Sequence, residues 1–153
     1  MMTQQRKRFA DAPEGFLQLV RTHYAVAAAT ERQIGVHYAR WRVLFVLYRD
    51  GTCTQKHLAD YFKVNAGTVT RMLQDLEKKG YVSRERDSED NRRARVTLTP
   101  AGEKLVRDGL PRRDALVSIA LRGFDEAAQQ RLAADLRMIE RNLVEAGLVP
   151  GAA

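Results

Sequence analysis

The sequence of 153 residues contains a single cysteine, Cys53, so it cannot form an internal disulfide. It has no apolar run near the roughly 18 residues that a membrane-spanning helix requires. Residues 1–12 are polar and basic, without the apolar region that follows the charges of a secretory signal peptide. These absences predict a cytoplasmic protein that does not enter a membrane and keeps its thiol reduced.

Motifs of enzymes and metal sites are also missing. The sequence contains no His-Glu-x-x-His, no Cys-x-x-Cys and no glycine-rich phosphate loop. The three histidines are not spaced as paired metal ligands, and the acidic group Asp87, Glu89 and Asp90 lacks the glycine and the final glutamate of a calcium loop. We therefore expect no catalytic activity, no bound metal and no cofactor.

Positive charge is present in excess. The chain has 26 Lys and Arg against 19 Asp and Glu, which gives a formal net charge of +7. A hydrophobic content of 44% and this length fit one globular domain with a sizeable core. A basic globular protein favours a polyanionic partner, either nucleic acid or an anionic membrane surface, and charge alone does not choose between them.

The two ends of the chain have helical patterns. Apolar spacing predicts an amphipathic helix from Glu14 to about Gly35. Thr99-Pro100 suits the start of another helix, which Pro111 should kink or interrupt, and Asp125 can cap a last one. The apolar stripes of these helices have no obvious partner in the middle of the chain. They favour a two-fold homodimer, and the alternative is that the three helices cover the central region within a monomer.

The middle of the chain has the pattern of a helix-turn-helix followed by a hairpin. A dense apolar run over residues 36–49 predicts a buried helix that ends at Asp50-Gly51. Thr54 and Asn65 can cap the next two helices. Residues 81–86 and 95–99 alternate as strands do, around a link without apolar residues. We expect an inner face of Val82, Val96 and Leu98, and an outer face of Arg84, Arg86, Arg95 and Thr97.

Two helices joined by a tight turn place the second helix in the major groove of DNA. Thr68, Thr70 and Arg71 at its start can bind base edges or phosphates, and Gly67 lets the helix backbone approach the DNA closely. In the hairpin, an arginine can enter a narrow minor groove, with Asp90 orienting the guanidinium of Arg92. The residues expected to contact or position DNA are Asn65, Gly67, Thr68, Thr70, Arg71, Gln74, Arg84, Asp90, Arg92 and Arg93.

These motifs together resemble the MarR family of winged helix-turn-helix transcriptional regulators. The resemblance rests on residues 36–44, Thr54-Gln55, Leu58-Ala59, Thr68-Val69-Thr70-Arg71, Leu76 to Gly80, the Asp90-x-Arg92-Arg93 tip and Leu98-Thr99-x-x-Gly102. It implies a mainly α fold with a small β-wing. The expected parts are an arm at 1–12, a winged helix-turn-helix DNA-binding domain at 36–99, and a helical dimerisation region built from 13–35 and 100–147.

The resemblance also implies a function. It implies a homodimer that binds a pseudo-palindromic site on double-stranded DNA, usually as a repressor, with Arg92 in the minor groove and Asp90 holding it. Two stretches, Asn65-Ala66-Gly67 and His37-Tyr38, depart from the residues common in the family. The first departure leaves the base sequence that the protein reads open.

The family resemblance further implies an effector, a small aromatic carboxylate or a phenol, bound between the dimer helices and the winged domain. Trp41 also fits a core position, and the histidines also fit structural roles. Two alternatives stay open: a redox-sensing regulator that uses Cys53, and a winged-helix protein that binds nucleic acid non-specifically or binds other proteins. The candidate effector-binding residues are His23, Tyr24, His37, Tyr38, Trp41 and Arg42.

Overall fold

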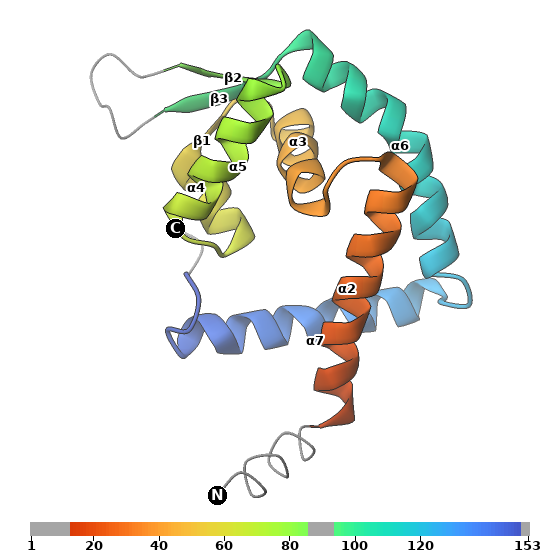
Figure 1. Cartoon of the computed structure of the whole chain (residues 1–153). Helices are drawn as coiled ribbons and strands as arrows, with labels where there is room; N and C mark the ends of the chain where they lie inside the picture. The colour runs from red at the N-terminus through yellow and green to blue at the C-terminus, as the bar shows by residue number, and fades with distance from the viewer. Residues whose placement is uncertain (1–12, 86–93, 151–153) are drawn as a thin grey trace, which may run out of the picture.

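The structure, a computed structural model that describes residues 13–85 and 94–150, is mainly helical with one small antiparallel sheet (Figure 1). This confirms the expected fold class. The elements in chain order are α2 (Glu14–Ile34), α3 (Tyr38–Asp50), β1 (Cys53–Thr54), α4 (Gln55–Phe62), α5 (Ala66–Lys78), β2 (Val82–Glu85), β3 (Arg95–Leu98), α6 (Pro100–Ala120) and α7 (Glu126–Glu145).

Side-chain oxygens cap the starts of four of the helices. Each cap oxygen accepts a hydrogen bond from a backbone N–H in the first helical turn, which would otherwise lack a partner. All four were predicted from the sequence. The bonds are His57 N to Thr54 Oγ1 (3.1 Å), Thr68 N to Asn65 Oδ1 (2.8 Å), Gly102 N to Thr99 Oγ1 (3.1 Å) and Ala128 N to Asp125 Oδ1 (2.7 Å).

The sheet has the strand order β1-β3-β2, and both pairings are antiparallel. The two strands of the hairpin were predicted, whereas β1 was not. With only two residues, β1 is too short to show alternation, and its pairing of Cys53 with Val96 is visible only in three dimensions. The sheet closes one side of the helix-turn-helix and supports the hairpin.

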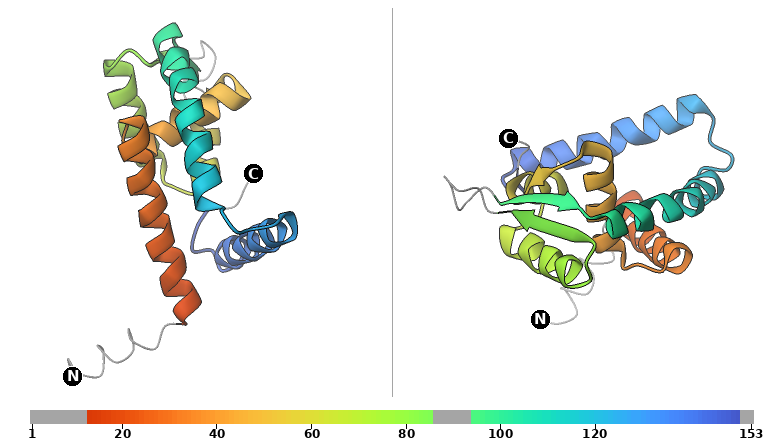
Figure 2. Two further views of the ribbon diagram at one scale, coloured as in Figure 1. Left: turned by 90° about the vertical axis from the view of Figure 1, so that its right-hand side faces the viewer. Right: turned by 90° about the horizontal axis from the view of Figure 1, so that it is seen from above.

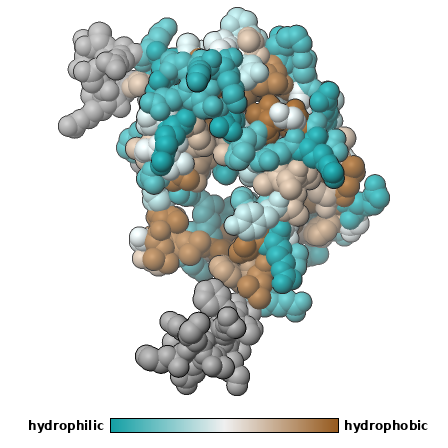
Figure 3. Space-filling view, in the orientation of Figure 1, coloured by the Kyte–Doolittle hydropathy of each residue, from teal (hydrophilic) through white to brown (hydrophobic). Residues whose placement is uncertain are grey.

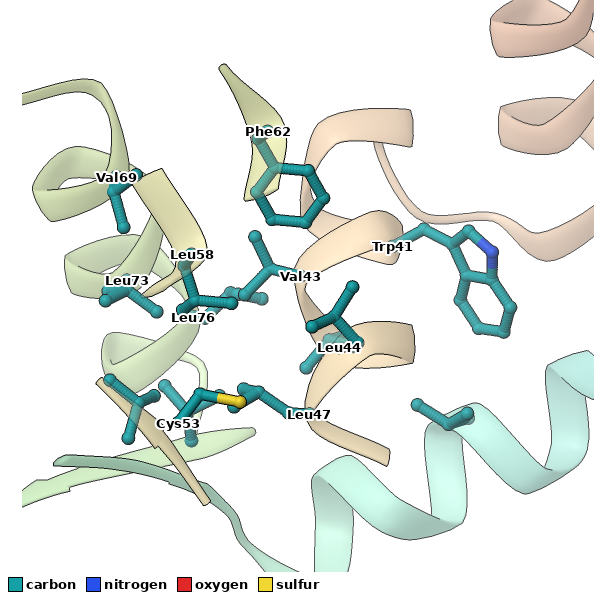
Figure 4. Packing of buried hydrophobic residues seen from close by; sticks show 14 of the residues in the cluster. Trp41, Val43, Leu44, Leu47, Cys53, Leu58, Phe62, Val69, Leu73 and Leu76 are labelled. Atoms are coloured by element: carbon teal, nitrogen blue, oxygen red, sulfur yellow. The ribbon is translucent and has the colours of Figure 1, made fainter. Parts of the chain in front are cut away.

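The core lies between α3, α4, α5 and the sheet (Figure 4). Leu44, Leu58, Leu73 and Leu76 are fully buried there, as the helical periodicity of the sequence requires. Trp41 points away from this group, toward α6 (Figure 4). A methyl group on Gly109 of α6 would lie 2.7 Å from Cη2 of Trp41, so the ring fits only because this position is glycine.

Helix α6 is continuous from Pro100 to Ala120, with Pro111 inside it. Of the two effects expected of Pro111, a kink or an interruption, the structure therefore excludes the interruption. A proline removes one hydrogen bond to the carbonyl four residues earlier. Pro111 lies on the exposed side of α6, where water can solvate that carbonyl group. The later part of α6 packs beside α2 (Figure 2).

The outer helices leave apolar surface uncovered. Helix α7 buries none of its residues. Figure 3 shows apolar surface on the lower side of the molecule, where α7 lies. The described residues of one chain therefore leave these stripes uncovered. The large apolar residues exposed on α2 and α7 are Phe16, Val20, Tyr24, Val26, Leu132, Leu136, Met138 and Leu143.

Candidate DNA-binding surface and ligand cavity

Helix α5 is presented to solvent by the turn that joins it to α4. Lys63 ends α4 in the left-handed conformation, with a φ of 54°, and Val64 N donates to Ala59 O over 3.1 Å. Because Val69, Leu73 and Leu76 anchor one face of α5 in the core, the opposite face is exposed. We call α5 the recognition helix, since the second helix of a helix-turn-helix is the one that enters the major groove.

Several of the predicted DNA-contacting side chains hold the start of the recognition helix. Besides its capping bond, Asn65 Oδ1 accepts from Thr68 Oγ1 over 3.0 Å. Thr70 Oγ1 donates to Ala66 O over 2.9 Å and accepts from the side chain of Gln55 in α4. Gln55 was not among the predicted site residues, although it follows the Thr54 cap. The first turn of the recognition helix therefore has these side-chain hydrogen bonds in place without DNA.

Arg71, Gln74 and Gly67 lie on the exposed face of the recognition helix. Arg71 Nε donates to Gly67 O over 3.3 Å, which leaves the rest of the guanidinium on the outside of the helix. Arginine and glutamine can each form paired hydrogen bonds with the edge of a purine. Direct contacts with bases stay a prediction for these residues.

Arg84 does not lie where the sequence analysis placed it. Burial along β2 alternates so that Arg84 shares the inner face with Val82, whereas Ser83 and Glu85 are exposed. Its guanidinium donates from Nε to Glu77 Oε2 over 2.9 Å, and from Nη2 to the same oxygen. Hydrogen bonding from Arg84 lowers the pKa of Glu77 below its ordinary value. Arg95 and Thr97 are on the exposed face, as expected.

The other side of the recognition helix is held by α3. Arg40 Nε contacts Asp75 Oδ2, and Lys79 Nζ lies 3.3 Å from the same oxygen. The two contacting atoms of Arg40 and Asp75 are inaccessible to water. Asp90, Arg92 and Arg93, which were predicted to form the minor-groove contact, lie outside the described residues.

A cavity of about 500 Å³ lies between α2, α3 and α6. Its walls are mostly apolar, from Val26, Trp41, Phe45 and Leu116 among others. Arg42 and Arg113 are the two cationic side chains in its lining. Arg113 stacks over the ring of Phe45, 4.9 Å from its centroid, and its Nη1 lies 2.9 Å from the carboxylate of Asp114.

Three of the six predicted effector-binding residues line this cavity, namely Tyr38, Trp41 and Arg42. Arg42 makes no ion pair with a described carboxylate; its guanidinium lies 4.5 Å from the ring centroid of Phe62 and 5.6 Å from that of Tyr38. The sequence reasoning missed Arg113 and the other residues of α6. Their apolar spacing was visible, but not which side of α6 faces α3.

The remaining three predicted effector-binding residues lie outside the lining. His37 caps α3, because its Nδ1 accepts from Ala39 N over 3.3 Å, and its Nε2 lies 3.6 Å from Glu31. His23 packs edge-on against Tyr24 and Tyr38. These side chains have structural contacts, which was the alternative interpretation of the histidines.

Cys53 is buried against the core, with only 8% of its surface exposed. Burial raises the pKa of its thiol, so little thiolate exists near neutral pH. The thiol is a poor nucleophile in that state, which is unfavourable for redox sensing.

In the described parts of the chain, no group of three or more His, Cys, Asp or Glu is placed to hold a metal ion. Among the helices of those same parts, none combines the length and the apolar character that spanning a membrane requires.

The arrangement of a helix-turn-helix followed by an antiparallel hairpin defines a winged helix-turn-helix protein. Residues 36–94 match the model of the MarR family. Among curated proteins, the uncharacterized HTH-type transcriptional regulator YwoH of Bacillus subtilis is 43% identical over 70 residues, which is 46% of this chain and half the length of YwoH. The uncharacterized HTH-type transcriptional regulator YdgJ of the same organism is 29% identical over 87% of this chain and 80% of its own length.

Solved structures match over most of the chain. The Staphylococcus aureus MepR–DNA complex has a TM-score of 0.73 and 25% identity, and covers 87% of this chain and all of that one. BpsR of Bordetella bronchiseptica, whose DNA binding is regulated by 6-hydroxynicotinic acid, shares the fold with a TM-score of 0.74 and 22% identity, over 84% of this chain and 99% of its own. These similarities assign residues 36–94 to the MarR family of DNA-binding transcriptional regulators, and most of the chain shares the fold of solved members of that family.

Proposed function

We propose that the protein is a homodimeric repressor that releases a pseudo-palindromic operator when a small aromatic carboxylate or phenol binds in the cavity. The observation that carries the proposal is the cavity itself. It is mostly apolar, large enough for a single aromatic ring, and has Arg42 and Arg113 in its lining. An apolar site with few polar groups is the usual form of a small-molecule site.

A ligand of this class fits the lining chemically. An aromatic ring can pack against Trp41 and Phe45, and a carboxylate or phenolate can accept hydrogen bonds from Arg42. The role of 6-hydroxynicotinic acid in BpsR supports the same class, since that compound combines an aromatic ring with a carboxylate.

Homodimerisation is supported by the apolar faces of α2 and α7, which a single chain leaves exposed. A two-fold axis would present two recognition helices to two half-sites about one helical turn apart, roughly 34 Å. A ligand that binds beside α3 would change the separation of these helices and so weaken binding.

The first experiment is footprinting on the DNA that flanks the protein's own gene. A specific regulator should prefer one protected site over unrelated duplex DNA by about 10³-fold or more. Arg71→Ala and Gln74→Ala should weaken binding and relax the base preference, while Glu126→Gln on α7 serves as a control outside the recognition helix. Equal affinity for the protected site and unrelated DNA would favour the non-specific binder instead.

The second experiment tests the cavity. Trp41 is the only tryptophan in the chain, so its fluorescence reports on occupancy of the cavity. Titration with aromatic acids should change this fluorescence and release the DNA at the same concentrations. Arg42→Gln should weaken both effects about tenfold, as expected for a lost charged hydrogen bond, and Arg107→Gln on the exposed side of α6 is the matched control. A broad panel without either response would refute the effector proposal.

A further inference from the structure

We call the hairpin of β2 and β3 the wing. The ion pair between Arg84 and Glu77 joins the wing to the recognition helix at a second point. The first connection is the covalent turn of residues 79–81, where Tyr81 N donates to Leu76 O over 3.0 Å. Arg84 comes three residues after Tyr81, the last residue of this turn. At about 3.3 Å per residue of strand, it lies roughly 10 Å from the turn. A turn alone acts as a hinge, whereas two separated attachments fix the angle between two elements.

The position of the pair favours this structural use of Arg84. Only 25% of the Arg84 side chain is exposed, and two of its nitrogens donate to a single oxygen of Glu77. Arg84 is on the inner face of β2 with Val82, and so it faces α5 and not the outside of the hairpin. Hydrogen bonds between two charged groups are roughly twice as strong as those between neutral groups, so this pair can hold β2 against α5.

Glu77 is otherwise unfavourable on a helix that approaches DNA. A carboxylate close to phosphates repels them, so an acidic residue on α5 should weaken DNA binding unless it has a compensating role. The neighbouring contact of Arg40 with Asp75 has the same form, an acidic residue of α5 held by a cation from another element. Both carboxylates attach the recognition helix to the rest of the domain.

We propose that Arg84 and Glu77 are positioning residues that fix the wing relative to the recognition helix, so that one rigid unit reaches two neighbouring grooves. This inference rests on DNA binding by the winged domain, and not on the ligand. It differs from the prediction that Arg84 contacts DNA itself, and the two alternatives give opposite results when Glu77 is changed.

The experiment compares Glu77→Gln, Arg84→Gln and the double variant on the footprinted fragment. If Arg84 binds a phosphate, Glu77→Gln removes a repulsive charge, frees the guanidinium and leaves binding equal or tighter. If the pair positions the wing, Glu77→Gln weakens binding about tenfold, the order expected for one charge-assisted hydrogen-bonded pair. Arg84→Gln should then cost the same factor, and the double variant should be no weaker than either single variant.

Salt dependence gives a second readout. If Arg84 contacts a phosphate, Arg84→Gln alone should make the fall of log affinity with log salt less steep, by about 0.9 in the slope. If the pair positions the wing, Glu77→Gln and Arg84→Gln should reduce the steepness equally, because both lose the same contacts of the wing. Hydroxyl-radical footprints should show weaker protection of the minor groove in both variants, with protection by the recognition helix retained.

Three controls keep the outcome unambiguous. Glu103→Gln removes one exposed carboxylate from α6 and should leave affinity unchanged. If the Gln variants unfold, Arg84→Lys is used instead, because it retains the charge and the aliphatic stem. Positioning by the pair predicts a several-fold loss of DNA affinity in this variant, because lysine lacks the fixed donors of a guanidinium. A phosphate contact by Arg84 predicts nearly normal binding. If the wild type protects no specific site, the operator proposal fails, and the same variants are compared on unrelated duplex DNA at low salt. Tighter or unchanged binding by Glu77→Gln on either DNA overturns the inference.

Discussion

Replacing Gly102 by alanine tests the junction between the wing and α6. Gly102 is buried in the first turn of α6, and an added methyl group would lie 2.0 Å from the carbonyl oxygen of Tyr81 and 3.1 Å from Cδ2 of Leu98. The oxygen belongs to the backbone, so it cannot rotate away as a side chain can. The start of α6 must therefore move by about 1 Å to restore a normal contact.

The size of the effect follows from the contacts that this movement disturbs. Overpacking costs about 1–3 kcal/mol. The same shift strains the hydrogen bond from Thr99 N to Tyr81 O (3.0 Å) and the Thr99 cap on Gly102 N (3.1 Å), each contributing about 1 kcal/mol. Alanine returns at most about 1 kcal/mol of helix propensity. We expect Gly102→Ala to lower the free energy of unfolding by about 3 kcal/mol, or Tm by roughly 6–12 °C for a chain of this size.

Urea unfolding followed by circular dichroism measures the change, at one protein concentration because subunit association makes the midpoint concentration-dependent. Gly15→Ala is the matched control: Gly15 lies in the first turn of α2 with no atom within 4 Å of the added methyl, so stability should stay equal or rise slightly. If Gly102→Ala unfolds within about 0.5 kcal/mol of the wild type, a typical surface effect, the junction is softer than its geometry indicates.

Three further outcomes are expected. Gly109→Ala should push the Trp41 ring, 2.7 Å from the new methyl, toward the cavity; we expect altered tryptophan fluorescence and weaker aromatic-acid binding with the fold retained, and unchanged ligand affinity would contradict this packing. Hydrogen bonds from Arg49 lower the pKa of Asp50, and hydrogen bonds from Arg84 lower the pKa of Glu77. The folded state therefore favours the charged forms of both carboxyl groups. Their contribution to stability is present above the ordinary carboxyl pKa values of 3.8 and 4.5 and is lost as pH falls through the lower folded values, so urea midpoints should drop below about pH 4.5, and less steeply in Glu77→Gln. Cys53→Ser should respond to peroxide as the wild type does, since the thiol is buried; loss of a peroxide response in this variant alone would instead establish redox sensing.

Local chemistry explains the features of the fold that were predicted correctly. The caps at Thr54, Asn65, Thr99 and Asp125 act within three residues of themselves, so their positions are readable in the chain. The buried face of α5 follows in the same way from helical periodicity. The sequence left open whether Pro111 kinks or interrupts its helix, because a helix can continue past a proline where water reaches the freed carbonyl, and periodicity does not show that.

Arg84 was misplaced for a different reason. Its charge suggested solvent or phosphate, yet the two-residue period of β2 already grouped it with Val82. The correct face was therefore available in the sequence, but its partner was not. Glu77 becomes a neighbour only when the strand folds back along the recognition helix.

The amino-acid sequence by itself determined the order of the helices and of the two hairpin strands, the capped helix starts and the exposed face of α5, because these depend on neighbours a few residues apart. Only the tertiary structure decided which charges are partners and where the cavity lies. Arg42 and Arg113 come from α3 and α6, and they share one cavity because a glycine at 109 lets α6 approach Trp41 closely. Contacts of that kind depend on how whole elements pack, since the volume between two helices belongs to neither of them.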